Sequence, residues 1–296
     1  MVNIPYKFGG NLLGMMVNTA LFQDAGVPLP PMDVSKAWTA EQFLQTAQKL
    51  TKVGADGSVA QFGASLPGSA VYTWTLLWGT DWLSDDLKTV TCDSAAMIAG
   101  YQWMQDLAYK HHVVAQSGEA ARLFPGANVF MAGKQAMGWT ATANYVANMN
   151  LARDANVKLT IAPAPALKFS TPDVNSHGLF IVKGNKHPDD AWEAIKFFSE
   201  KSRLATFAGA MTTILADLEG AIREASKAHP AIEAKVVKQI LEGAKKGINL
   251  KRHPAQDDML GIINPAITEL NDNKVPAADL MRRIKPQLQA LADQAK

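Results

Sequence analysis

The sequence predicts an α/β fold, and three observations carry that prediction. The chain has 296 residues, 48% of them apolar and 19% charged, which is the composition of a folded protein with a sizeable core. Apolar residues at helix spacing and apolar residues at strand spacing alternate along its first two thirds, as they do when helices pack on a sheet. From about Thr212 to Lys296 the strand signals vanish, so the last third is predicted to be helical.

The first surface helix is predicted from a capping box. Thr39 is the expected N-cap and Gln42 its partner at the third helical position, while Trp38 and Phe43 fit a hydrophobic staple around the same turn. The helix is expected to end before the turn that begins at Gly54.

A second helix is predicted from about Asp93 to Lys110, because four apolar residues recur there at spacings of three and four. These residues are Met97, Tyr101, Met104 and Leu107. A stripe of this kind buries one side of a helix, so the helix is expected to pack on the core.

Three further segments carry strand signals. Residues 130–137 are typical of a helix end that Gly133 turns into a strand, and alternating apolar residues from 157 to 161 predict another strand. The apolar run Leu179–Val182 predicts a strand buried on both faces. A helix opened by Pro188 is expected to follow it.

Charge and cysteine content exclude several classes of function. The net charge of +2 comes from 29 basic and 27 acidic residues spread along the chain, which makes nucleic acid an unlikely partner. The single cysteine, Cys92, provides neither a disulfide framework nor a structural zinc site. No apolar run approaches the ~20 residues that span a bilayer, and residues 1–7 lack the features of a secretory signal.

Signatures of catalysis are also missing from the sequence. It contains no GxSxG, HExxH, Walker or GxGxxG motif. The neighbouring acids Asp189 and Asp190 stand where a helix start favours acids, and His111 and His112 have no histidine four residues on to share a metal. The sequence therefore predicts a protein that is not an enzyme and needs no cofactor or metal.

Six short patterns, in order along the chain, resemble those of one protein family. They begin with Ile4-Pro5-Tyr6, the strand Met15-Met16-Val17-Asn18 with the helix Leu21-Phe22-Gln23-Asp24-Ala25-Gly26, and the Trp38–Phe43 helix start. They continue with Phe130-x-x-Gly133-Lys134-x-Ala136-Met137, Pro163-Ala164-Pro165, and Gly178-Leu179-Phe180-Ile181 followed by His187-Pro188 and Ala191–Phe198. Together they resemble the extracellular solute-binding proteins of ABC sugar importers, the family that includes maltose-binding protein.

The resemblance implies a type II periplasmic-binding-protein fold of two lobes. The family normally has a further quarter to third of a chain upstream of Ile4, so a truncated first lobe and a largely complete second lobe are expected. Residues 1–11 and 174–211 would be the crossover and the remnant of the first lobe. Residues 12–173 and 212–296 would form the second lobe. Strands near Leu179 would then expose edges and apolar faces.

The same resemblance implies a function. The chain is expected to bind a carbohydrate-like small molecule between its lobes and to deliver it to the permease subunits of an ABC transporter, in the periplasm or at the cell surface. A dimer or a second chain would cover the missing part of the first lobe. The alternatives are a truncated lobe that serves as a protein interaction module or as half of a two-chain binder, and an α/β enzyme whose site has no recognised motif.

Sugar recognition requires aromatic platforms and side chains that exchange hydrogen bonds with hydroxyls. In the stretch Lys7–Asn11, Gly10 allows close backbone approach, and Asn11 falls where the family has a polar residue facing the cleft. The alternative is a hinge bend with Asn11 as a turn former. Lys7 belongs to the same candidate group.

Aromatic residues are dense between Ser65 and Trp82. Beside the loop that contains Ser69, Tyr72 and Trp74 are the predicted stacking residues. At least two of the four aromatic residues there, which include Trp78 and Trp82, are expected to pack in the core instead.

A second aromatic group follows the strand at Ala136-Met137. The resemblance implies an aromatic platform here, for which Trp139 and Tyr145 are the candidates, and Thr140, Thr142 and Asn144 could serve hydroxyls or cap the next helix. Two further candidates come later in the chain. His177 stands at the expected cleft strand, where a structural role is the alternative.

Arg252, with its neighbour His253, could pair with an acidic sugar or a phosphate from its loop. The alternative for this segment is a solvated basic loop.

Overall fold

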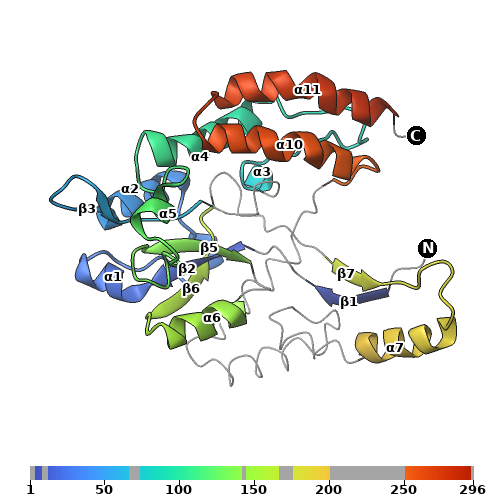
Figure 1. The fold of residues 1–296 in the computed structure, drawn as a ribbon, viewed down its shortest axis with the longest axis horizontal. Helices are drawn as coiled ribbons and strands as arrows, with labels where there is room; N and C mark the ends of the chain where they lie inside the picture. Colours follow the sequence, from blue (N-terminus) through green and yellow to red (C-terminus); the bar gives the residue numbers. More distant parts are fainter. Residues whose placement is uncertain are drawn as a thin grey trace.

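A computed structural model of the chain describes residues 4–8, 13–66, 74–141, 145–166, 176–200 and 251–294. Helices and strands alternate through the first four of these ranges, and the last range consists of two long helices (Figure 1). The predicted α/β class is present, and the predicted C-terminal helices are present in residues 251–294. Residues 212–250, to which the same prediction applied, lie outside the described residues.

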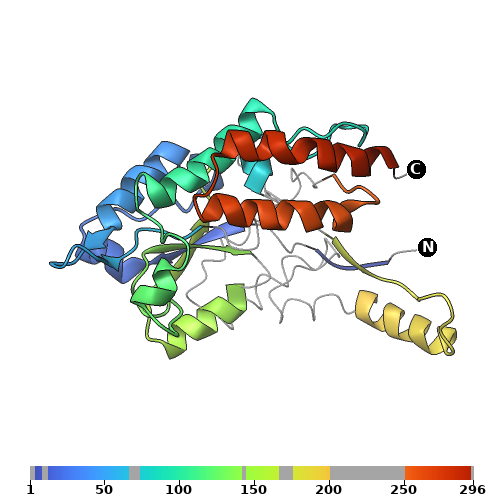
Figure 2. The same cartoon turned by 45° about the horizontal axis from the view of Figure 1, so that its top comes forward.

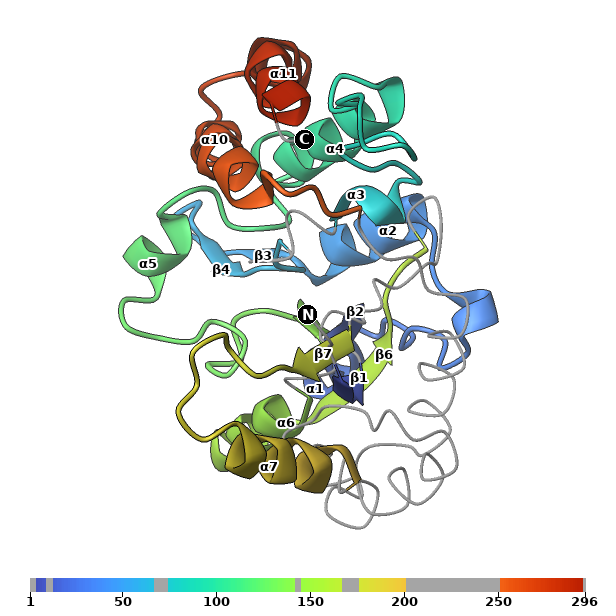
Figure 3. The ribbon, with the colours of Figure 1, turned by 90° about the vertical axis from the view of Figure 1, so that its right-hand side faces the viewer.

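The central sheet has the strand order β5-β2-β6, with β2 (Leu13–Asn18) in the middle. Strand β5 (Met137–Ala141) and strand β6 (Leu159–Pro163) both pair with it in antiparallel register, with Met15 opposite Trp139 and Ala162. Helix α2 (Ala40–Leu50) covers one face of the sheet, and α6 (Tyr145–Asp154) lies on the other side (Figure 3).

Short elements complete this part of the chain. Helix α1 (Thr19–Asp24) follows β2 directly and is capped by the Asn18 side chain. The single-turn helix η1 (Val34–Lys36) and a small hairpin of β3 (Lys52–Val53) and β4 (Val59–Gln61) flank α2. Along the chain, the short helix α3 (Trp74–Leu77) precedes α4 (Ala95–Tyr109), and the short helix α5 (Glu119–Leu123) follows it.

The predicted capping box at α2 is confirmed in full. Thr39 Oγ1 accepts a hydrogen bond from the Gln42 backbone N–H at 3.2 Å, and Gln42 Oε1 accepts one from the Thr39 N–H at 2.9 Å. Phe43 and Leu50 are fully buried, so α2 packs its apolar face on the sheet as expected. The pattern alone was sufficient because both partners of the box lie within one turn.

The helix predicted from 93 to 110 is also confirmed, as α4 with Ser94 as N-cap. All four residues of its predicted stripe are buried. Against it pack the C-terminal helices α10 (Gln256–Asn271) and α11 (Ala277–Gln294), which run side by side (Figures 1 and 2).

Two cores result from this packing. The first joins α4, α10 and α11, and the second joins α1, α2 and the central sheet. Leu66, Trp103 and Trp139 are half-buried and contact both cores. These three side chains therefore connect the C-terminal helices to the sheet.

A separate ribbon is formed by β1 (Ile4–Phe8) and β7 (Ser176–Leu179), which pair antiparallel, with Ile4 opposite Leu179. Helix α7 (Pro188–Glu200) begins at the predicted proline and packs on β1 (Figure 1). The ribbon therefore brings together two segments that are far apart in the sequence.

The prediction of a doubly buried strand at 179–182 is wrong. The strand ends at Leu179, and Phe180 and Val182 beyond it are 51% and 58% exposed. An apolar run becomes a buried strand only if neighbouring strands and helices cover it, and β7 has β1 as its one strand neighbour among the described residues. The expectation of exposed apolar faces near Leu179 is confirmed.

Residues 130–137 also differ in part from the prediction. Gly133 has a φ of +68° and turns the chain toward β5, as expected. Residues 129–133, however, form successive turns instead of a helix. The turns are held by backbone hydrogen bonds from the Ala132 and Gly133 N–H groups to the Asn128 and Phe130 carbonyls, at 2.8 and 3.0 Å.

The single thiol is buried in the first core. Cys92 is fully buried, its Sγ donates to the Met281 carbonyl at 3.5 Å, and burial raises the pKa of the thiol to about 12. Because the thiolate is the reactive species, we expect an aromatic disulfide reagent to label Cys92 in native buffer only as fast as this core opens. Labelling should be immediate in guanidinium chloride above ~5 M, because only hyperstable proteins have an unfolding midpoint beyond that concentration. Immediate labelling in native buffer would contradict this packing.

Candidate functional site

Two of the ten predicted site residues have described side chains, Trp139 and Arg252. Lys7, Trp74, Tyr145 and His177 have a described backbone only, in β1, α3, α6 and β7 respectively. Gly10, Asn11, Ser69 and Tyr72 lie outside the described residues.

Trp139 lies on β5 and packs inward. Its indole N–H donates to the Ser65 carbonyl at 3.0 Å, and its ring is tilted against Phe43 with 5.8 Å between the centroids. Ser65 also donates its backbone N–H to the Met137 carbonyl at 3.1 Å. Trp139 and Met137 thus join the chain at Ser65 to strand β5.

The same row of aromatic rings continues away from β5. Phe43 contacts Trp103 at 5.9 Å, and Trp103 contacts Trp78 at 5.9 Å. A Cβ on Gly100 would come within 2.8 Å of the Trp78 ring, so that ring lies directly on helix α4. The four rings form a continuous row from β5 to helix α4.

The expectation that at least two of the four aromatic residues from 72 to 82 pack in the core is confirmed. Trp82 is 2% exposed and contacts Tyr101 at 5.9 Å, and Trp78 is half-buried against Trp103. Tyr72 and the Trp74 side chain, which were predicted to stack on solute, are the two that the described residues do not include.

Thr140 has a structural contact as well. It is 5% exposed, and its Oγ1 accepts a hydrogen bond from Asn148 Nδ2 at 2.8 Å. This bond joins β5 to α6 across the segment that holds Thr142 and Asn144. Thr142 and Asn144 themselves lie outside the described residues.

Arg252 is exposed, and its neighbours fix the loop that carries it. The Lys251 backbone N–H donates to Asp81 Oδ2 at 3.1 Å, and Lys251 Nζ contacts the Leu83 carbonyl at 2.9 Å and Asp85 at 2.8 Å. His253 is buried, and its Nδ1 accepts from the Ala255 N–H at 3.1 Å at the start of α10. The segment is therefore held in place on both sides of Arg252.

Asp81 is the carboxylate that anchors this loop, and the sequence did not identify it. Burial raises the pKa of Asp81 above its usual value, against the opposing effect of hydrogen bonds from the Lys251 and Trp82 backbone N–H groups. Its partner at position 251 is 170 residues away, so no local pattern could have revealed the pair.

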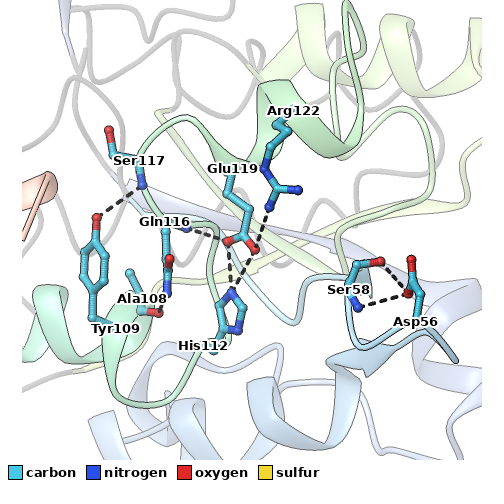
Figure 4. Close-up of polar contacts among 9 residues, drawn as sticks. All are labelled: Asp56, Ser58, Ala108, Tyr109, His112, Gln116, Ser117, Glu119 and Arg122. Carbon is cyan, nitrogen blue, oxygen red and sulfur yellow. Dashed lines mark hydrogen bonds and ion pairs between the residues drawn. The ribbon is translucent and has the colours of Figure 1, made fainter.

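A second polar cluster, also missed, closes the loop between α4 and α5 (Figure 4). His112 Nε2 lies 3.0 Å from both carboxylate oxygens of Glu119, and the Gln116 backbone N–H donates to the same carboxylate at 2.9 Å. Glu119 is 9% exposed, so its charge is compensated within the protein. A carboxylate can only accept, so His112 donates from Nε2.

The cluster yields a stability prediction with a matched control. Glu119→Ala should lower the free energy of unfolding by about 1–3 kcal/mol, because the His112 and Gln116 donors lose their acceptor. Arg122 reaches the same carboxylate at 3.9 Å but has a side chain that is 69% exposed, so Arg122→Ala should cost less than about 1 kcal/mol. Urea unfolding measures both changes, and equal effects of the two variants would contradict the assigned roles.

The described residues contain no group of three or more histidine, cysteine or acidic side chains that could hold a metal ion. Within the same ranges, none of the helices has the length and apolar character needed to cross a membrane.

The comparisons with known proteins agree on one family and one fold. The family model described as "Bacterial extracellular solute-binding protein" matches residues 3–202. A search of curated proteins finds no match to the chain.

Solved structures with the same fold bind sugars. The ABC substrate-binding protein Lmo0181 from Listeria monocytogenes, in complex with cycloalternan, has a TM-score of 0.80 and 16% identity over 97% of this chain and 71% of its own. The maltose/maltodextrin-binding domain MalE from Bdellovibrio bacteriovorus, bound to maltotriose, has a TM-score of 0.69 and 16% identity over 99% of this chain and 72% of its own.

A third neighbour is the cyclic alpha-maltosyl-1,6-maltose binding protein from Arthrobacter globiformis, with a TM-score of 0.71 and 14% identity over 98% of this chain and 72% of its own. The two-lobe binding-protein fold predicted from the sequence is thereby confirmed. The chain spans 71% to 75% of the length of the neighbouring chains.

Proposed function

Because the chain belongs to the family of bacterial extracellular solute-binding proteins, we propose that it binds a carbohydrate and delivers it to the permease of an ABC importer. The family match over residues 3–202 carries this proposal. It is supported by the sugars named with the structural neighbours, which are cycloalternan, maltotriose and a cyclic maltosyl-maltose. The chain is a binding protein and not an enzyme.

The proposed division into lobes follows the family. Residues 1–11 and 174–211 form the crossover and the first-lobe part, and residues 12–173 and 212–296 form the second lobe. Contacts among β1, β7 and α7 support the first group. The packing of α10 and α11 on α4 supports the second.

The proposed binding residues are the ten predicted from the sequence. Lys7 and His177 face each other in the register of β1 and β7, which brings the crossover and the cleft strand together. Gly10, Asn11, Ser69, Tyr72, Trp74, Trp139, Tyr145 and Arg252 complete the set. The Trp139 side chain is held by its hydrogen bond to Ser65 and its contact with Phe43. In the proposed role, only the exposed part of this indole contacts the solute.

In the proposed mechanism, solute bridges the lobes and favours the closed state through contacts made only there. The closed form then docks on the permease in the periplasm or at the cell surface. Sugars need apolar ring contacts and paired hydrogen bonds, and the proposed residue set contains both kinds of side chain.

Thermal unfolding with a panel of solutes tests this function. A solute that binds only the folded protein raises the unfolding midpoint. We expect a shift with at least one of the oligosaccharides, sugar alcohols and sugar phosphates in the panel, and none with amino acids or peptides. A shift with amino acids or peptides alone would overturn the carbohydrate assignment.

A further inference from the structure

The exposed turn between β3 and β4 contains the pair Asp56–Gly57. It is the one aspartate–glycine pair in the sequence, which has no asparagine–glycine pair. Gly57 has a φ of +80°, which a glycine adopts without strain. Because glycine also lacks a Cβ, no side chain shields the amide nitrogen that follows Asp56. This pair is therefore the place in the chain where a side chain and the backbone are best able to react with each other.

The reaction open to such a pair is isomerisation of the aspartate. The Gly57 nitrogen attacks Cγ of the protonated Asp56 carboxyl group, so that an N–C bond forms and a C–O bond breaks. The amide proton and the hydroxyl group leave together as water, and the product is a succinimide ring. Water then adds to one of the two ring carbonyls. The ring opens either to aspartate or to isoaspartate, in which the backbone runs through Cγ.

In the folded turn, the Asp56 carboxylate is bound to Ser58. Asp56 Oδ1 accepts a hydrogen bond from the Ser58 hydroxyl at 2.8 Å and another from the Ser58 backbone N–H at 3.0 Å (Figure 4). Both bonds favour the ionised carboxylate and hold the pKa of Asp56 below its ordinary value, with the Ser58 hydroxyl as the largest cause. Less of the carboxyl group is then protonated, and the protonated form is the one that can release water.

The nitrogen that would attack is held as well. The Gly57 N–H donates to the Gly54 carbonyl at 3.0 Å, and the Gly54 N–H donates to the Ser58 carbonyl at 2.8 Å. Ring closure requires the Gly57 nitrogen to lose its proton and to turn toward Cγ of Asp56, so the bond to the Gly54 carbonyl must break first. The turn therefore restrains both reacting groups, the carboxyl group through Ser58 and the nitrogen through Gly54.

We infer that Asp56–Gly57 is a modification site, at which aspartate converts spontaneously to isoaspartate, and that the hydrogen bond from the Ser58 hydroxyl slows this conversion in the folded protein. Isoaspartate adds a methylene group to the backbone of a turn whose flanking residues Lys52 and Gln61 face each other in the β3–β4 pairing. Gln61 Nε2 also donates to the Leu50 carbonyl at 2.6 Å, at the end of α2. The modification thus acts on a hairpin that is fixed to α2, whichever solute the protein binds.

Peptide mapping after incubation in oxygen-18 water tests the inference, because each ring opening places one oxygen atom from water on Asp56. In native buffer, Ser58→Ala should raise the rate of label uptake at Asp56 by about threefold or more, the factor that corresponds to one net hydrogen bond. Ser58→Thr keeps the hydroxyl group and should react at the parent rate. In denaturant, where the turn is absent, the parent and Ser58→Ala should take up label equally fast, and both faster than the folded parent.

Asp86 supplies the matched control. Its Oδ1 accepts hydrogen bonds from the Ser84 hydroxyl at 2.6 Å and from the Lys88 backbone N–H at 3.1 Å, much as Asp56 does from Ser58. The next residue, however, is Leu87, whose side chain hinders ring closure, so Ser84→Ala should leave Asp86 unlabelled over the same period. Equal label uptake by the folded parent and Ser58→Ala would overturn the role of the Ser58 hydroxyl. In the unfolded chain, absence of label at Asp56, or label at Asp86 just as fast, would overturn the assignment of the site.

Discussion

Replacing Gly63 by alanine should lower the free energy of unfolding by about 3 kcal/mol or more, at the upper end of overpacking effects. A Cβ at this position would lie 2.0 Å from the Ala47 carbonyl oxygen and 2.8 Å from Ala47 Cα. These are backbone atoms of α2, which cannot rotate away as a side chain would. The helix would have to move off the segment 62–65, whose backbone is hydrogen-bonded to β5 and its approach.

Gly261→Ala is the matched control for that experiment. Gly261 lies within α10, and a Cβ added there would meet no atom within 4 Å, so the same substitution should stabilise the protein by about 0.5–1 kcal/mol through helix propensity. Urea unfolding followed by tryptophan fluorescence measures both variants. An unfolding free energy for Gly63→Ala within about 0.5 kcal/mol of the parent would contradict the close approach of α2.

Phe43→Ala should destabilise the protein by about 3–5 kcal/mol, the usual cost of removing a buried aromatic ring. Phe43 is fully buried and touches both Trp103 and Trp139, so its loss opens a cavity beside the two rings that contact both cores. The tryptophan emission should also shift to longer wavelength as water approaches the two indoles.

The same change at an exposed phenylalanine isolates the effect of burial. Phe180 is 51% exposed, so Phe180→Ala should change the unfolding free energy by less than about 1 kcal/mol. Chemical denaturation of the two variants in parallel gives the comparison. A cost for Phe43→Ala no greater than that for Phe180→Ala would mean that the row of rings does not hold the two cores together.

Local features of the fold could be predicted from the sequence because their causes are local. The Thr39–Gln42 box and the stripe on α4 each depend on residues within a few turns of one another. The apolar run at 179–182 has the same local signal as a central strand, but its burial depends on which strands and helices surround it. That information is not contained in the run itself.

The candidate site was less accessible to sequence reasoning for a related reason. Trp139 was predicted as a platform from the family resemblance, and its contact with Ser65, 74 positions away, could not be anticipated. Asp81 and Lys251 are likewise joined only by the fold. The aromatic composition of residues 72–82 predicted core packing correctly for Trp78 and Trp82, since large aromatic side chains are mostly buried.

Isothermal titration calorimetry tests the carbohydrate assignment most directly. The purified chain is titrated with maltotriose and with cycloalternan, the sugars bound by two of its structural neighbours. A mixture of amino acids and short peptides serves as the control titrant. Saturable one-to-one binding of an oligosaccharide, with no heat from the control, is the result that the account predicts. Saturable binding of the control titrant, with no heat from either sugar, would contradict it.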